Sequence, residues 1–110
     1  MQITILGTSA MVPTKNRNHS SIFIQFESEG ILFDCGEATQ KQLKLAGHKL
    51  TKISRILISH WHGDHVLGLP GLIQSISSED ENKTLHIYGP KGTEKKMQML
   101  SRVFDSDIQI

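Results

Sequence analysis

Apolar and polar residues alternate along the first third of the chain with the period of a β-strand. Residues 2–6 alternate in polarity and are rich in β-branched side chains, which predicts a strand. Residues 21–26 and 31–34 predict two more strands, with residues 29–30 as a short hairpin turn between them. Residues 8–18 contain a proline and two asparagines and are expected to form a loop.

Further along the chain, segments with the apolar spacing of an amphipathic helix alternate with short apolar runs. Residues 37–46 carry an acidic residue near their start and are followed by glycine, so they predict a helix. Two more helices are expected over residues 70–77 and 91–103, and strands over residues 55–59 and 85–88. The resulting order of strands and helices predicts an α/β layer.

Composition is that of an ordinary globular domain. The 110 residues are 37% hydrophobic and 21% charged, which is enough for one domain with its own core. A net charge of +1 excludes a broad basic track for nucleic acid but leaves room for a local phosphate contact. No apolar run approaches the roughly 20 residues that cross a bilayer, and the N-terminus does not resemble a signal peptide, so we expect a cytoplasmic protein. Cys35 is the only cysteine and is expected to be buried; a disulfide or a cysteine-based zinc finger is excluded.

The densest group of chemically capable side chains is residues 60–65, which read His-Trp-His-Gly-Asp-His. Imidazole nitrogens and carboxylate oxygens are ligands that a hydrolytic zinc ion prefers. The group directly follows the predicted strand at residues 55–59, and α/β proteins keep their chemistry at such strand ends. Three histidines and an aspartate packed this closely favour a metal site over isolated surface or core residues.

The spacing within this group predicts two metal ions. In an extended segment His60 and His62 point the same way, so both can hold one ion. Asp64 and His65 follow across a turn that Gly63 permits, and they fit a second position better than the first. Two ions about 3.5–4 Å apart can hold and activate a water and stabilise a leaving oxygen. Zn²⁺ is the expected metal, although Mn²⁺ or Fe would accept the same ligands.

The motif and its flanking segments carry a resemblance to a known family. Residues 60–65 resemble the His-x-His-x-Asp-His motif of the metallo-β-lactamase superfamily. Residues 5–8, 13–18, 33–40, 65–72 and 89–92 resemble segments of ribonuclease Z, the endonuclease family that removes 3′ trailers from precursor tRNA. The resemblance extends from residue 1 to about residue 104. It implies that residues 1–110 form one metallo-β-lactamase-like domain, the N-terminal half of an αββα sandwich.

The resemblance also implies roles for particular residues. His60 and His62 would ligate the first zinc ion. Asp64 and His65 would ligate the second, with Asp64 also orienting or deprotonating the bridging water. Asp34 would hold the metal loop through hydrogen bonds. The alternative for Asp34 is a plain strand-end or helix-capping residue.

Substrate contacts and assembly follow from the same resemblance. Lys15, Arg17 and Asn18 would contact the end of precursor tRNA; the alternative is a solvated polar loop. The family commonly works as a homodimer. Ser9 and Ala38 stand where the family usually has glycine, and we expect only modest backbone effects from either change.

The family's remaining ligands lie in a second half that these residues do not include: a third histidine, a bridging aspartate, a final histidine and a general-acid histidine. We therefore expect the 110-residue polypeptide to bind zinc weakly and to have little or no nuclease activity alone. Two alternatives stay open. One is another hydrolase of the superfamily, arylsulfatase-like or phosphodiesterase, and the other is a non-catalytic zinc-binding or interaction fragment. A half-sandwich should also expose an apolar sheet face and self-associate.

Overall fold

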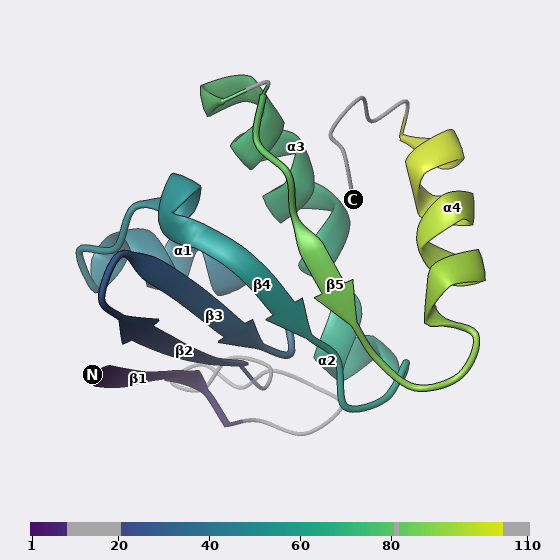
Figure 1. Cartoon of the computed structure of the whole chain (residues 1–110). Helices are drawn as coiled ribbons and strands as arrows, with labels where there is room; N and C mark the ends of the chain where they lie inside the picture. Colours follow the sequence, from purple (N-terminus) through teal and green to yellow (C-terminus); the bar gives the residue numbers. More distant parts are fainter. Residues whose placement is uncertain (9–20, 81, 105–110) are drawn as a thin grey trace.

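The computed structural model describes residues 1–8, 21–80 and 82–104, and its centre is a twisted five-stranded sheet (Figure 1). The strands lie side by side in chain order: β1 (Gln2–Gly7), β2 (Ser21–Phe26), β3 (Glu29–Phe33), β4 (Ile53–Leu57) and β5 (His86–Tyr88). The first three strands are antiparallel, whereas β3, β4 and β5 run parallel. The carboxyl ends of β3, β4 and β5 therefore meet at one edge of the sheet.

The helices form the connections that parallel strands require. They are α1 (Thr39–Leu45), a 3-10 turn η1 (Leu50–Lys52), α2 (Gly63–Val66), α3 (Leu69–Glu79) and α4 (Thr93–Val103). The segment from β3 to β4 contains α1, and the segment from β4 to β5 contains α2 and α3. Both α1 and α3 lie behind the sheet as seen in Figure 1. The alternation of strands and helices confirms the predicted α/β class.

The hydrophobic core lies between the sheet and these helices. Alternate strand positions point into it, so Phe23, Leu32 and Ile56 are almost fully buried. From the helices, Leu43 and Leu72 are fully buried against them. Each of these side chains contributes roughly 1.5–3 kcal/mol through its removal from water.

The hairpin turn between β2 and β3 was predicted at the wrong residues. It is formed by Glu27 and Ser28, and Glu27 takes a positive φ of 56°. Gly30 instead belongs to β3 and pairs with Gln25. A Cβ on Gly30 would come within 2.7 Å of the Phe23 ring, so this glycine makes room for a core side chain rather than for a turn.

The segment after β4 also differs from its prediction. The strand ends at Leu57 rather than at residue 59. Gly63 is the first residue of the short helix α2 and not a left-handed turn residue; among the described glycines, positive φ is confined to Gly47 and Gly92. The polar residues that follow β4 are thus carried by a loop and then by one turn of helix.

The opposite face of the sheet carries no helix in the described part of the chain (Figure 1). One row of paired positions crosses all five strands on this face: Ile5, Ile22, Phe33, Leu57 and Tyr88. Ile5 is 66% exposed and Tyr88 is 50% exposed. Among residues 1–8, 21–80 and 82–104, no helix has the length and apolar character needed to cross a membrane.

Candidate metal centre

Residues 58–62, here called the metal loop, leave the carboxyl end of β4 and lead into α2. Trp61 anchors the middle of this loop. Its ring packs against the core and its Nε1 donates a hydrogen bond of 2.9 Å to Thr93 Oγ1. His60 and His62 flank this anchor, and their ring centroids are 4.7 Å apart. The prediction that the two histidines share a direction agrees with this geometry.

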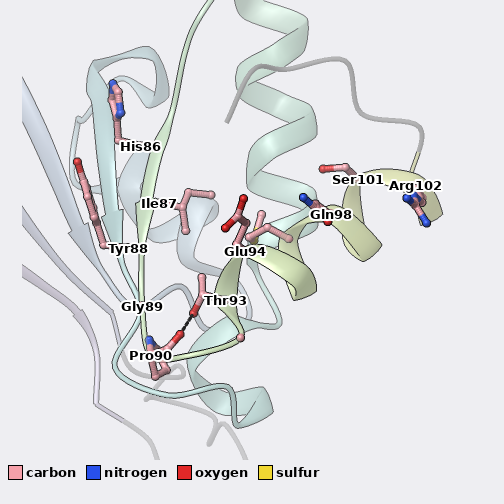
Figure 2. A pocket seen from close by; sticks show the side chains of 12 residues that line it. His86, Ile87, Tyr88, Gly89, Pro90, Thr93, Glu94, Gln98, Ser101 and Arg102 are labelled. Carbon is pink, nitrogen blue, oxygen red and sulfur yellow. Dashed lines mark hydrogen bonds between the residues drawn. The ribbon is translucent and has the colours of Figure 1, made fainter.

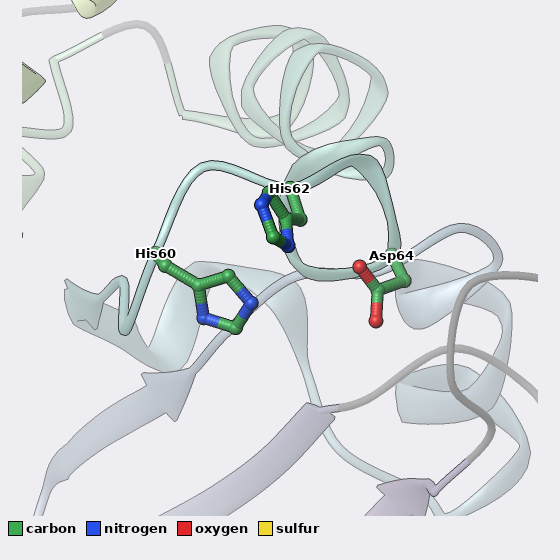
Figure 3. A group of neighbouring side chains, drawn as sticks. All are labelled: His60, His62 and Asp64. Carbon is green, nitrogen blue, oxygen red and sulfur yellow. The ribbon is translucent and has the colours of Figure 1, made fainter.

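His60, His62 and Asp64 form a group that can hold a metal ion (Figure 3). One ligand atom from each residue lies within 4.8 Å of the others. Asp64 is buried at 5% exposure, whereas His62 is exposed to solvent. The group therefore has a buried carboxylate at its base and an approach from solvent.

Asp64 also contacts His65, the other ligand expected for a second ion. His65 Nε2 lies 3.2 Å from Asp64 Oδ2. A neutral imidazole with its proton on Nδ1 cannot donate to that oxygen, so the nitrogen and the oxygen are placed to share a metal ion. Two ligand atoms at zinc bond lengths of about 2.0–2.1 Å in a tetrahedron lie roughly 3.3 Å apart, so this pair is spaced for one ion. The nitrogen and carboxylate donors fit zinc, and Asp64 lies between the two sets of ligands.

Asp34 supports both the metal loop and His65 from the end of β3. Its Oδ1 accepts a hydrogen bond of 2.8 Å from the Ser59 backbone N–H. Its Oδ2 lies 2.8 Å from Ser59 Oγ and 2.7 Å from His65 Nδ1. Because a carboxylate accepts such bonds, His65 donates through Nδ1 and its Nε2 is left for a metal. The carboxylate thus contacts residues 25 and 31 positions away in the sequence.

The backbone around Cys35 fastens α2 to the sheet. The Cys35 N–H donates to His65 O at 2.7 Å, and the Gly68 N–H donates to Cys35 O at 2.9 Å. Cys35 itself is fully buried, as predicted. Burial raises the pKa of its thiol to about 12, against a weak opposing hydrogen bond from Thr39, so the thiol stays protonated.

Lys15, Arg17 and Asn18, the predicted substrate contacts, fall outside the described residues. His48 stacks near Phe23 with ring centroids 4.5 Å apart. Sequence reasoning missed Ser59, which contacts both Asp34 and His60. Only its position directly before the first histidine marked Ser59 in the sequence. A serine at that position does not by itself indicate a functional role.

A groove in the described residues lies away from the metal group. It has a volume of about 840 Å³ and lies between β5 and α4 (Figure 2). Glu94, Gln98 and Arg102 line its α4 side, and Tyr88 and Gly89 line its β5 side. The metal-capable residues instead lie at the edge of the sheet where the parallel strands end.

A sheet of this topology with a His-x-His-x-Asp-His loop at its parallel edge is a metallo-β-lactamase fold. The structure is similar to a metallo-β-lactamase fold protein from Bacillus subtilis, with a TM-score of 0.74 and 27% identity over 88% of this chain and 41% of that chain. It is also similar to the short form of human tRNase Z, with a TM-score of 0.87 and 39% identity over 98% of this chain and 41% of that chain. These likenesses confirm the fold expected from sequence.

The chain belongs to the family described as anti-Pycsar protein Apyc1, whose model matches residues 1–107. Among curated proteins it is similar to Ribonuclease Z of Methanothermobacter thermautotrophicus, with 46% identity over 100% of this chain and 37% of that protein. It is also 50% identical to Ribonuclease Z of Methanococcus maripaludis over 94% of this chain and 33% of that protein. The resemblance to ribonuclease Z is therefore confirmed. The chain spans about a third of the length of these curated relatives.

Proposed function

We propose that residues 1–110 are the N-terminal part of a zinc-dependent endoribonuclease that removes the 3′ trailer from precursor tRNA. The observation that carries this proposal is the 46% identity to a Ribonuclease Z along the whole chain. The metal-capable group of His60, His62 and Asp64 supports it independently, because hydrolysis of a phosphodiester by this fold needs such ligands.

In this proposal each ligand has a separate task. His60 and His62 hold one zinc ion, while Asp64 and His65 hold the second. The 3.2 Å separation of Asp64 and His65 supports that second pair. Zinc bound there would make hydroxide available near neutral pH by acidifying a water. Asp64 would orient the attacking water, and Asp34 would keep His65 in its ligating orientation.

Substrate binding is assigned to three residues between positions 15 and 18. Lys15, Arg17 and Asn18 would contact the RNA end, since cationic side chains form charge-assisted hydrogen bonds with phosphate. We further propose a cytoplasmic protein that works as a homodimer and meets precursor tRNA there.

The number of ligands limits what these residues can do alone. A catalytic zinc ion takes about three protein ligands, and the four proposed residues supply two for each ion. We therefore expect the 110-residue polypeptide to bind zinc weakly and to show no turnover on precursor tRNA. Efficient cleavage by this polypeptide alone would contradict the ligand count.

A chimera tests the function directly. Residues 1–107 of this chain would replace the matching segment of the Methanothermobacter thermautotrophicus Ribonuclease Z, to which they are similar. With Zn²⁺ present, the chimera should release the 3′ trailer from a precursor tRNA. His62→Ala should reduce the rate at least about 100-fold, since it removes a metal ligand. The matched control is His86→Ala, an exposed histidine on β5, which should leave the rate within about twofold.

A second candidate function is favoured by one finding. The matching family is described by an anti-Pycsar protein and not by ribonuclease Z, which keeps open another hydrolase of this superfamily, such as a phosphodiesterase or an arylsulfatase-like enzyme. A folded chimera that hydrolyses a phosphodiester or arylsulfate dye but not precursor tRNA would favour that candidate. A folded chimera that binds zinc and hydrolyses none of these substrates would favour a non-catalytic zinc-binding fragment.

A further inference from the structure

Ser59 lies between Asp34 and His60, at the start of the metal loop. Its Oγ is 2.8 Å from Asp34 Oδ2 and 3.1 Å from Oδ1. The same Oγ is 3.0 Å from His60 Nδ1. One hydroxyl therefore contacts both a carboxylate and a ring nitrogen of a proposed metal ligand.

The direction of these hydrogen bonds follows from the number of protons. A serine hydroxyl has one proton and can accept further bonds, whereas an ionised carboxylate can only accept. The Ser59 proton is therefore donated to Asp34. Toward His60, Ser59 Oγ can only accept, so His60 Nδ1 must carry the ring proton.

We propose that Ser59 is a positioning residue that sets the tautomer of His60. With the proton held on Nδ1, the Nε2 lone pair is free for the ion, so this inference rests on the proposed metal role of His60. Asp34 then orients two ligands at once: His65 directly at 2.7 Å, and His60 through the Ser59 hydroxyl. Hydrogen bonds behind metal-ligating histidines affect metal affinity by about 10- to 100-fold.

A purely structural role for Ser59 can be separated from this one. The Ser59 backbone N–H also donates to Asp34 Oδ1, at 2.8 Å. That bond holds the metal loop against β3 without the hydroxyl. Ser59→Ala should therefore keep the loop in place and remove only the contacts of the hydroxyl, which reach Asp34, His60 and, at 3.5 Å, His65 Nδ1.

The first test reads the tautomers of the metal-free 110-residue chain. Long-range proton–nitrogen NMR spectra at about pH 8, where an ordinary imidazole is mostly neutral, should show His60 with the proton on Nδ1. In Ser59→Ala, His60 should change to a mixture with the Nε2–H form. Ser59→Thr, which keeps the hydroxyl, should retain the wild-type state of His60. Ser54→Ala is the matched control, since the Ser54 hydroxyl contacts Glu29 and not the metal loop.

The second test measures Zn²⁺ affinity by competition with a chromophoric chelator. Ser59→Ala should weaken binding about tenfold, and Ser59→Thr should restore it. A Nε2–H tautomer of His60 in the unmodified chain, or an unchanged tautomer in Ser59→Ala, overturns the proposal whether or not Ser59→Ala stays folded. If the tautomers are as expected but the chain binds no zinc, the link through Ser59 stands and the proposed metal site fails.

Discussion

At the scale of single residues, the segment that follows β3 holds two non-glycine residues with positive φ, Asp34 at 59° and Ala38 at 68°. Asp34 is the kind of residue that tolerates this region, and its carboxylate and backbone are both held by hydrogen bonds. Ala38 has no side chain to make such contacts. For an ordinary residue the left-handed conformation costs roughly 1–2 kcal/mol. The conformational cost at Ala38 is therefore of this order, which agrees with the modest backbone effect expected there.

Ala38→Gly should raise the free energy of unfolding by about 0.5–1 kcal/mol. Removing the Cβ relieves the left-handed conformation, and the greater flexibility of glycine in the unfolded chain offsets part of the gain. Urea unfolding measures the change. Ala46→Gly is the control. Ala46 has a right-handed φ of −81°, so this variant should be less stable than the wild-type chain. A loss of stability in Ala38→Gly would show that its conformation is not strained.

The Cys35 thiol should resist alkylation in the folded chain. Its pKa is raised from 9.0 to about 12 by burial, so at pH 8 the thiolate fraction falls about a thousandfold, since each pKa unit is tenfold. The pKa of the thiol is higher in the folded chain than in the unfolded chain, so the neutral thiol favours the folded chain. The resulting gain in stability is fully present below about pH 9 and is lost as pH rises toward 12. Iodoacetamide labelling followed by mass spectrometry, with and without urea, checks this. Equal labelling rates in both conditions would be inconsistent with a buried thiol.

At the scale of elements, the junction between α2 and α3 depends on a close backbone contact. A Cβ on Gly68 would lie 2.1 Å from Gly36 O, which is too close without a backbone shift. Gly68 also donates to Cys35 O, beside the residue that supports the metal loop. The position of α2, and with it Asp64 and His65, therefore depends on glycine at this point.

Gly68→Ala should lower the free energy of unfolding by about 1–3 kcal/mol, because the added methyl group overpacks a rigid backbone contact. Zinc affinity should fall as well, since α2 carries two proposed ligands. Gly71→Ala, one turn further into α3, is the matched control. Its Cβ would approach only the flexible Gln40 side chain, at 3.3 Å, so the higher helix propensity of alanine should add up to about 1 kcal/mol. Similar unfolding curves for the two variants would contradict the close contact.

At the scale of the whole molecule, we expect association through the sheet face that carries no helix among the described residues. An apolar row that crosses all five strands is larger than the scattered apolar side chains of a typical surface. We expect the 110-residue polypeptide to form dimers or larger species through this face.

Ile5→Lys should weaken this association about tenfold or more, because burial of an isoleucine contributes roughly 1.5–3 kcal/mol. Leu45→Lys is the control. Leu45 is 71% exposed on α1, away from the sheet face. Sedimentation velocity over a concentration series compares the two variants. A monomeric wild-type chain at all concentrations would argue against an exposed association face.

Much of this molecule could be predicted from local sequence. Periodicity identified every strand and the three longer helices, because the pattern of burial repeats within a few residues. The group at residues 60–65 was recognisable since its ligands are neighbours in the sequence. Gly30 was misplaced in a turn because the sequence shows a glycine but not the Phe23 ring that packs against it.

The family resemblance implied a supporting role for Asp34, but the contacts behind the candidate ligands depend on tertiary structure. Asp34 meets Ser59 and His65 only because β3 and β4 pair in parallel and end at the same edge of the sheet. No local pattern encodes a contact across 25 or 31 residues, since it depends on the register of two strands and the packing of α2. The sequence by itself therefore determined the candidate ligands and the family, while the folded sheet decided which side chains contact those residues.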